Sequence, residues 1–190
     1  MKHFSSFLVI TLFFVVNNGF SQVKREVEER ISLEKLPNPI KSLLPIIKPN
    51  AKHLKFYHEI DGEKESYELK FKKEKTLFSI EFNKAGALED IEVLISTEQL
   101  PKAIIEALNP MFIRYKLVRI QKQFLPTGGE SPKRVIERSF ENNATPKAYE
   151  IVLLGKTKNE NKQFEFLFDP LGNILDKRTL MLPNQDHVIY

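Results

Sequence analysis

The stretch Phe78-Ser-Ile-Glu-Phe-Asn-Lys-Ala-Gly86 is the most informative part of this chain, because it returns in altered form as Phe164-Glu-Phe-Leu-Phe-Asp-Pro-Leu-Gly172. In both copies an apolar residue stands at every second position over the first five residues, which is the period of a strand with one buried face. An Asn or Asp followed three residues later by Gly then predicts a tight turn into another strand. The chain therefore contains one supersecondary unit twice.

Each copy also begins with the same helix signature. Ser32-Leu-Glu-Lys-Leu-Pro37 aligns with Ser96-Thr-Glu-Gln-Leu-Pro101, and apolar residues follow at spacings of three and four. This spacing predicts an amphipathic helix that buries one stripe. The stripes are Leu36, Ile40, Leu43, Leu44 and Ile47 in the first copy and Leu100, Ile104, Ile105 and Leu108 in the second.

Between each helix and its hairpin, the hydrophobic pattern has a period of two. Tyr67-Glu-Leu69 aligns with Tyr149-Glu-Ile151, and Asp61-Gly62 supplies a hairpin turn. We therefore expect four consecutive antiparallel strands after each helix, with the helix covering their apolar face. The predicted fold class is α+β: two tandem repeats, each a helix packed on one face of about four antiparallel strands, merged into one larger sheet.

The two repeats differ mainly by one insertion. Matching positions are offset by 64 residues before Phe124 and by 82 from Tyr149, which places the insert at residues 125–147. Ser131-Pro132 predicts a short helix there, with Val135, Ile136 and Phe140 able to dock on the body. Such an insert is either functional or a tolerated surface loop. The predicted segments are a leader at 1–21, a tail at 22–31, repeats at 32–95 and 96–182, and a tail at 183–190.

The face of the sheet away from the helices is expected to be in contact with water. Strand parity assigns its residues directly, because successive side chains point to opposite faces. They are Lys55, Tyr57, Glu59, Glu68, Lys70, Lys72, Ser79 and Glu81 in the first repeat and Arg119, Gln121, Gln123, Val152, Leu154, Glu165 and Leu167 in the second.

The N-terminus has the pattern of a secretory signal peptide. An apolar run of about ten residues, 7–16, follows Lys2, and Gly19-Phe20-Ser21 provides small residues for cleavage after Ser21. The alternative is an uncleaved N-terminal anchor, but the run is about half as long as a spanning helix. No cysteine follows it, so we expect a periplasmic or secreted protein that is not a lipoprotein and has no transmembrane span after cleavage.

The composition excludes several classes of protein. The 190 residues are 42% hydrophobic and 28% charged, as in an ordinary globular domain, and contain no cysteine for a disulfide scaffold, a thiolate zinc site or an iron–sulfur cluster. The net charge of +4 is too small to indicate a nucleic-acid partner.

No catalytic signature is present either. His53, His58 and His187 have no zinc-binding spacing, and the glycines form neither a phosphate-binding loop nor a nucleophile elbow. The acidic pairs Glu28-Glu29 and Glu89-Asp90 are expected to be solvated surface. We therefore predict that the chain is not an enzyme and has no catalytic, cofactor-binding or metal-binding residues.

The repeated Leu-Pro helix start, the Tyr-Glu-Leu strand and the Phe-x-Phe-(Asn/Asp)-x-x-Gly hairpin, after a signal peptide, resemble the PepSY-like proteins related in fold to beta-lactamase inhibitory protein. The resemblance covers roughly residues 32–180. It implies a small exported protein with its helices on one side of an antiparallel sheet and a concave other side that binds a protein partner. The family supplies no catalytic residues, and the long insert departs from its plain repeat.

Two functions follow as hypotheses. The first is an exported non-catalytic binding module, for example a protein or protease inhibitor, that holds another envelope or secreted protein. Its contacts would come from the outer sheet face and the insert, and the candidate residues are Tyr57, Lys72, Arg134, Arg138, Phe140, Leu154 and Leu167. The alternative is an envelope protein that binds a small ligand or an anionic surface through the lysine cluster Lys70-Phe-Lys-Lys-Glu-Lys75 with Lys52 and Lys55. The same lysines are also explained as protection of an exposed strand end.

Overall fold

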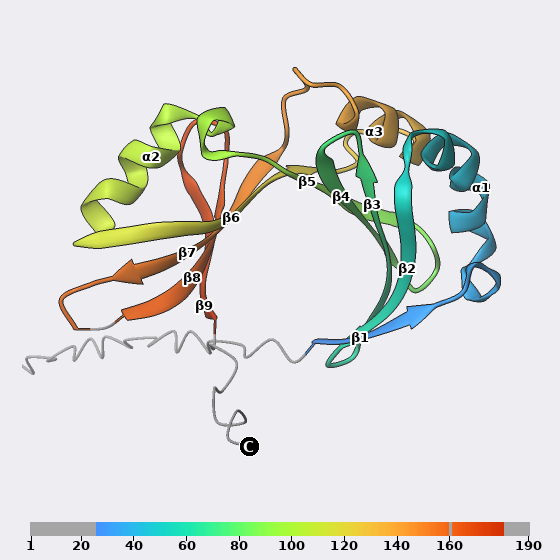
Figure 1. Cartoon of the computed structure of the whole chain (residues 1–190), viewed down its shortest axis with the longest axis horizontal. Coiled ribbons are helices and arrows are strands. Elements are labelled where there is room, and N and C mark those ends of the chain that lie inside the picture. Colours follow the sequence, from blue (N-terminus) through green and yellow to red (C-terminus); the bar gives the residue numbers. More distant parts are fainter. Residues whose placement is uncertain (1–25, 160, 181–190) are drawn as a thin grey trace, which may run out of the picture.

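The computed structural model describes residues 26–159 and 161–180. Within them, nine antiparallel strands form one sheet in which each strand pairs with its neighbours in the sequence (Figure 1). The strands are β1 (Glu26–Ile31), β2 (Lys52–Asp61), β3 (Lys64–Lys73), β4 (Thr76–Asn83), β5 (Leu88–Leu94), β6 (Arg114–Phe124), β7 (Ala148–Lys156), β8 (Asn161–Phe168) and β9 (Ile174–Leu180).

Three α-helices accompany the sheet in this part of the chain: α1 (Asn38–Ile47), α2 (Lys102–Leu108) and α3 (Pro132–Ser139). Short 3-10 turns flank the first two, at Leu33–Lys35, Lys48–Asn50, Thr97–Gln99 and Asn109–Met111. The sheet is strongly arched, and the helices lie on its convex side (Figure 1). The predicted α+β class, with one helix and four strands per repeat merged into a single sheet, is confirmed.

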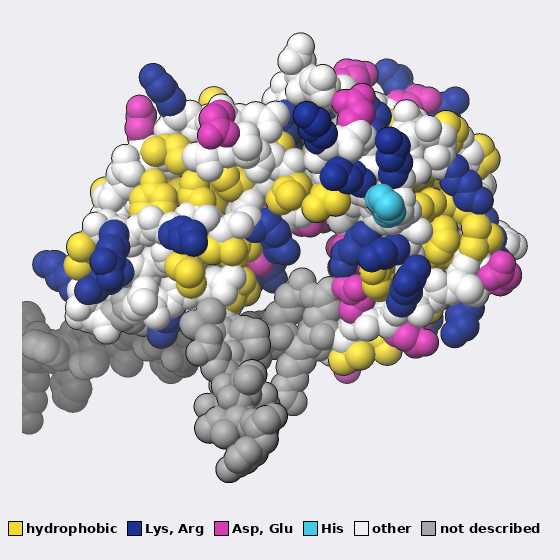
Figure 2. All heavy atoms as spheres, viewed as in Figure 1, with side chains coloured by type: hydrophobic (Ala, Val, Ile, Leu, Met, Phe, Trp, Pro, Cys, Tyr) yellow, Lys and Arg dark blue, Asp and Glu magenta, His cyan; other side chains and the backbone are white. Residues whose placement is uncertain are grey.

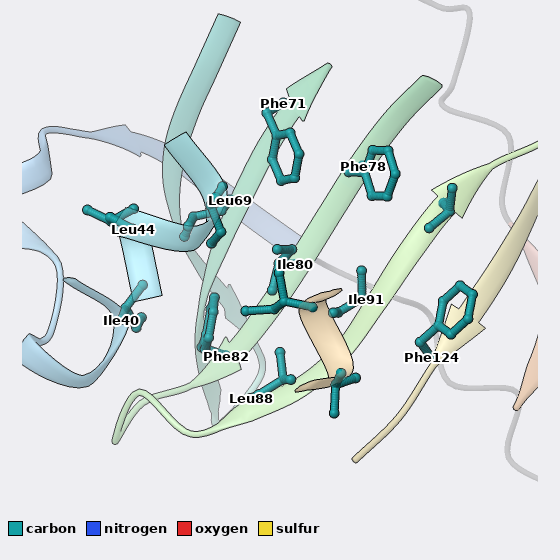
Figure 3. Close-up of a cluster of buried hydrophobic side chains, with 14 of the residues drawn as sticks. Ile40, Leu44, Leu69, Phe71, Phe78, Ile80, Phe82, Leu88, Ile91 and Phe124 are labelled. Atoms are coloured by element: carbon teal, nitrogen blue, oxygen red, sulfur yellow. The ribbon is translucent and has the colours of Figure 1, made fainter. Parts of the chain in front are cut away.

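The convex side is buried in two hydrophobic clusters, one for each repeat. In the first, Ile40 and Leu44 of α1 pack on apolar side chains of β3, β4 and β5 (Figure 3). In the second, Ile104 and Leu108 of α2 pack on β6, β7 and β8. The alternating apolar residues of each strand thus point to the helices, and the residues between them point to the concave side.

The repeated Asn/Asp-x-x-Gly turn has the same structure in both repeats. The Asn83 Oδ1 accepts hydrogen bonds from the backbone N–H groups of Ala85 and Ala87, and Asp169 does the same for Leu171 and Asn173. The glycine that ends each turn has positive φ and lies against the start of the repeat's helix, Gly86 against α1 and Gly172 against α2. The motif therefore joins the hairpin to the helix that covers it.

Strand β1 was not predicted, because residues 22–31 were expected to form a tail. Residues 26–31 instead pair with β2 along their whole length, and Ile31 is buried. Four of these six residues are charged, so the alternation is hidden when the sequence is considered alone. The leader at 1–21 and the tail at 183–190 lie outside the described residues, and no helix within the described ranges is long and apolar enough to cross a bilayer.

The insert forms the expected short helix, and this helix belongs to the hydrophobic core. The Ser131 side chain accepts a hydrogen bond from the backbone N–H of Arg134 and caps α3. Val135 and Ile136 are completely buried against the first cluster. Phe140 packs edge-on against Phe78, with ring centroids 5.4 Å apart. The insert therefore covers part of the first repeat's convex face.

Candidate functional site

The concave side of the arch encloses a hollow of about 760 Å³ lined by residues of β1 to β8. Figure 2 shows basic side chains gathered around a histidine beside this hollow and acidic side chains at its inner margin. The balance of charge inside is the reverse of that of the whole protein, because eight carboxylates face four lysine or arginine side chains. The charged lining is Glu28, Glu59, Glu68, Glu81, Asp90, Glu92, Glu150 and Glu165, with Lys55, Lys70, Lys72 and Arg119.

The expectation that this whole face is in contact with water is wrong in part. Glu59, Glu68, Gln121, Val152 and Glu165 are all buried. The cause is the curvature of the sheet, which brings side chains on its concave side closer together than in a flat sheet. Parity therefore identified the face, whereas burial depended on the shape of the whole sheet.

Three carboxylates form a row across neighbouring strands. Glu68 of β3 lies directly opposite Glu81 of β4, and Glu81 lies directly opposite Asp90 of β5. Like charges at directly opposed positions of a sheet are destabilising. Lys64 partly compensates, with its Nζ 2.9 Å from Glu81 and 2.8 Å from Glu89. The row is thus an arrangement that stability alone does not favour.

At one end of the hollow, Lys70 contacts three carboxylates. Its Nζ lies 2.6 Å from Glu28, 2.6 Å from Glu68 and 3.9 Å from Glu59. Burial alone would lower the pKa of Lys70, but hydrogen bonds to Glu28 and Glu68 raise it above its usual value. The oxygens of these three carboxylates lie within 4.8 Å of one another, as metal ligands do. The charged ammonium group of Lys70 contacts the same oxygens and supplies the positive charge that a metal ion would bring.

The centre of the hollow has a different character, set by Asp90 and Glu92, which we call the central carboxyl pair. Gln123 donates to Asp90 at 2.9 Å, and Gln121 donates to Glu92 at 2.6 Å. Burial, followed by the charge of Glu81, raises the pKa of Asp90 to about 7. Burial, followed by the charges of Glu150 and Asp90, raises the pKa of Glu92 to about 8. Both groups therefore hold protons to a large extent near neutral pH.

Two of the candidate residues predicted from the sequence, Tyr57 and Lys72, line the hollow. Leu154 and Leu167 lie on the same face, further towards β8, but outside the lining. Leu77 and Leu94 add exposed apolar surface inside the hollow.

The three candidates from the insert lie elsewhere, because α3 packs on the convex side. Arg134 and Arg138 line a separate depression with Leu125 and residues 127–130 and 145–147. Arg138 is already engaged, with its Nη2 2.9 Å from Glu130. Phe140 is half-buried in the core contacts described above. The seven candidates therefore do not form one site.

The lysine cluster is divided in the same way. Lys70 lies among carboxylates, and Lys73 lies over the ring of Phe140, with 5.6 Å between its Nζ and the ring centroid. Lys55 and Lys72 lie at the hollow beside His53, and Lys52 and Lys75 are exposed. Lys70 and Lys73 are thus engaged with side chains of the protein itself.

Sequence reasoning misses the central carboxyl pair, because it predicts Glu89-Asp90 to be solvated surface. A usable signal was present: Asp90 and Glu92 alternate with the apolar Ile91 and Val93 in the expected strand. The same parity that placed Glu81 on the concave face also places these two acids there.

This arched sheet, with helices on one side and a charged hollow on the other, defines a class of small α+β proteins built from two repeats. No family model and no curated protein matches the sequence. Solved structures do share the fold. A DUF2874 family protein from Bacteroides uniformis is similar with a TM-score of 0.53 and 13% identity, over 76% of this chain and 89% of that one.

Two further structures extend the comparison. A Bacteroides eggerthii protein, whose name assigns it provisionally to the periplasm, has a TM-score of 0.54 and 14% identity, over 75% of this chain and 88% of that one. A BLIP-like protein from Bacteroides fragilis has a TM-score of 0.50 and 15% identity, over 80% and 92%. At these identities the likeness concerns the fold, and it confirms the expected similarity to the fold of beta-lactamase inhibitory protein. The PepSY-like assignment stays a prediction.

Proposed function

We propose that this chain is an exported, non-catalytic binding module whose hollow holds a segment of another envelope or secreted protein. The observation that carries the proposal is the row Glu68, Glu81 and Asp90, in which acidic side chains are directly opposed across three neighbouring strands. Ionised carboxylates at such positions oppose folding, so each needs a cation or a proton. Groups held at a cost to stability in a concave, partly desolvated place are characteristic of binding sites.

Export has separate support. The N-terminal pattern predicts a cleaved leader, and the fold is shared with the Bacteroides eggerthii protein provisionally assigned to the periplasm. Binding of a protein is supported by the shared fold of the BLIP-like protein from Bacteroides fragilis.

A photo-crosslinking experiment tests the use of the hollow. Leu94, which is exposed inside it, is replaced by a benzophenone-bearing amino acid, and the control variant carries the same group at the exposed Leu171 in the β8–β9 turn. We expect one envelope protein to cross-link at position 94 and not at 171, and the additional change Glu81→Lys to abolish the product. Cross-linking that is equal at both positions, or insensitive to Glu81→Lys, would place the binding surface elsewhere.

The alternative of an anionic surface remains as an outcome of a second test. Salt-sensitive binding to vesicles containing an anionic phospholipid, lost in the Lys72→Glu, Lys73→Glu double variant, would favour the lysine cluster. We expect no such binding, because Lys70 is neutralised by carboxylates and Lys73 packs on Phe140.

A further inference from the structure

We propose that the hollow receives an arginine or lysine side chain of the partner protein at the central carboxyl pair, Asp90 and Glu92, beside the amide oxygen of Gln121. This inference rests on the proposed function and specifies the chemistry of the partner.

The first argument is the distribution of cations among the eight lining carboxylates. Six of them have a lysine or arginine nitrogen within 4.0 Å. Their partners are Lys70 for Glu28, Glu59 and Glu68, Lys64 for Glu81, Arg119 for Glu150, and Arg178 for Glu165. Asp90 and Glu92 are the two exceptions among the described residues, since their hydrogen bonds come from neutral glutamine amides. Lys64 and Arg119 act on the pair only from a distance, so a cation from outside fits the place where the described residues provide none in direct contact.

The second argument is independent of charge. The Gln121 side chain is only 8% exposed and lines the hollow, and its Oε1 is buried without a hydrogen-bond partner in the described part of the chain. An unsatisfied buried acceptor costs free energy, on the order of 1–3 kcal/mol. An N–H donor from a ligand would remove this cost. A guanidinium group offers five donors in one plane, so it can serve carboxylates and an amide oxygen together.

The position in the fold adds a third argument. The central carboxyl pair lies on β5, and its two glutamine partners lie on β6, where the two repeats join. These strands pair over only four residues of each, from Ile91↔Phe124 to Leu94↔Gln121. A ligand at this place contacts both repeats at once.

Binding of a cation at this site is coupled to the protonation of Asp90 and Glu92. The groups that act on the pair come from four strands: Lys64 from β3, Glu81 from β4, Arg119, Gln121 and Gln123 from β6, and Glu150 from β7. In the free protein, burial and the neighbouring acids keep protons on the pair near neutral pH. An arriving cation favours the ionised carboxylates, so binding releases protons and tightens as the pH rises.

The test uses the mature protein and the peptide acetyl-Ala-Gly-Arg-Gly-Ala-amide as the probe, with the same peptide containing citrulline as the uncharged control. Binding is followed by NMR through the side-chain amide signals of Gln121 and Gln123. We expect the arginine peptide to shift both signals and to bind more tightly at pH 8 than at pH 6, and the citrulline peptide to do neither. The Asp90→Asn, Glu92→Gln variant should bind more than about tenfold more weakly. Glu106→Gln, which removes one negative charge from an exposed position on α2, should change nothing.

Several results would overturn the inference. The first is equal binding of the arginine and citrulline peptides, and the second is an affinity for the arginine peptide that is the same at pH 6 and pH 8. The third is an arginine peptide that leaves the NMR signals of Gln121 and Gln123 unshifted at pH 8. Each of these results contradicts the inference. Methylguanidinium that binds as tightly as the peptide would assign the site to small guanidinium compounds in place of a protein side chain. Cross-linking at position 94 that persists when Asp90→Asn and Glu92→Gln are added would leave the proposed function standing and remove this inference. No cross-linking at position 94 in the protein without these two changes would remove the proposed function itself.

Discussion

Lys70 is a single residue on which one end of the hollow depends. Its Nζ contacts Glu28, Glu68 and Glu59, so its removal leaves three neighbouring carboxylates without their shared cation. We expect Lys70→Met to lower the free energy of unfolding by about 1–3 kcal/mol, less than for a fully buried pair because Lys70 is partly exposed. Lys72→Met, two residues along the same strand, should cost less than about 0.5 kcal/mol. Urea unfolding at pH 7 measures both, and equal losses would mean that Lys70 has no special role.

Gly172 lies so close to α2 that a side chain at this position would clash with the helix. Its φ is +88°, and a Cβ there would lie 2.8 Å from the backbone oxygen of Ala103 in α2. Gly62 has a similar φ of +63° but open space around it. Both alanine variants should lose about 1 kcal/mol from the left-handed backbone. We expect Gly172→Ala to lose at least about 1 kcal/mol more in thermal unfolding, and a loss no larger than that of Gly62→Ala would contradict the close contact.

Helix α3 belongs to the insert in the second repeat but stabilises the first repeat. Ile136 is completely buried in the first cluster. Ile136→Ala should therefore lower the free energy of unfolding by about 2–5 kcal/mol, while Glu137→Ala on the exposed side should stay within about 0.5 kcal/mol. Chemical denaturation followed by circular dichroism compares them. A small effect of Ile136→Ala would mean that the insert is a loosely attached loop.

Local patterns were sufficient to predict most of these elements. The period of two, the Asn83 to Gly86 turn and the apolar stripe from Ile40 to Ile47 are properties of neighbouring residues, and the strands and helices follow from them. Strand β1 could not be found in this way, because its pairing with β2 is a property of the sheet edge and its own residues are mostly charged.

The candidate site was less accessible from the sequence. Parity placed Tyr57 and Lys72 on the concave face, but ion pairs such as Lys70 with Glu28 join residues 42 positions apart. The acids that have no cation in contact can be identified only when all the strands are in place, because the cations that contact the other acids come largely from different strands. Arg134 and Arg138 lie away from this face, because their helix docks on the other side of the sheet. A contact between the insert and a partner stays a prediction.

The pH dependence of stability belongs to the whole molecule, because the groups that set it come from several strands of both repeats. The pKa of Asp90 is raised to about 7 and that of Glu92 to about 8, against ordinary values of 3.8 and 4.5. Between the ordinary and the raised pKa of each group, the folded chain keeps a proton that the unfolded chain has released. For these two groups stability is therefore greatest below about pH 4, falls as the pH rises by up to about 1.4 kcal/mol per pH unit for each group, and levels off above about pH 8.

This dependence distinguishes a binding site from a structural arrangement. The Asp90→Asn, Glu92→Gln variant keeps the shapes of both side chains and removes both titrations. Its free energy of unfolding, relative to wild type, should rise by at least about 2 kcal/mol between pH 5 and pH 8 in urea titrations. Glu106→Gln, at an exposed position on α2, should show no such trend. A variant that becomes more stable at pH 8 and at the same time loses the arginine peptide has exchanged binding for stability, as expected of residues kept for a ligand. If instead the variant gains nothing between pH 5 and pH 8, the pair is accommodated without cost, and the physical reason for assigning a ligand to it disappears.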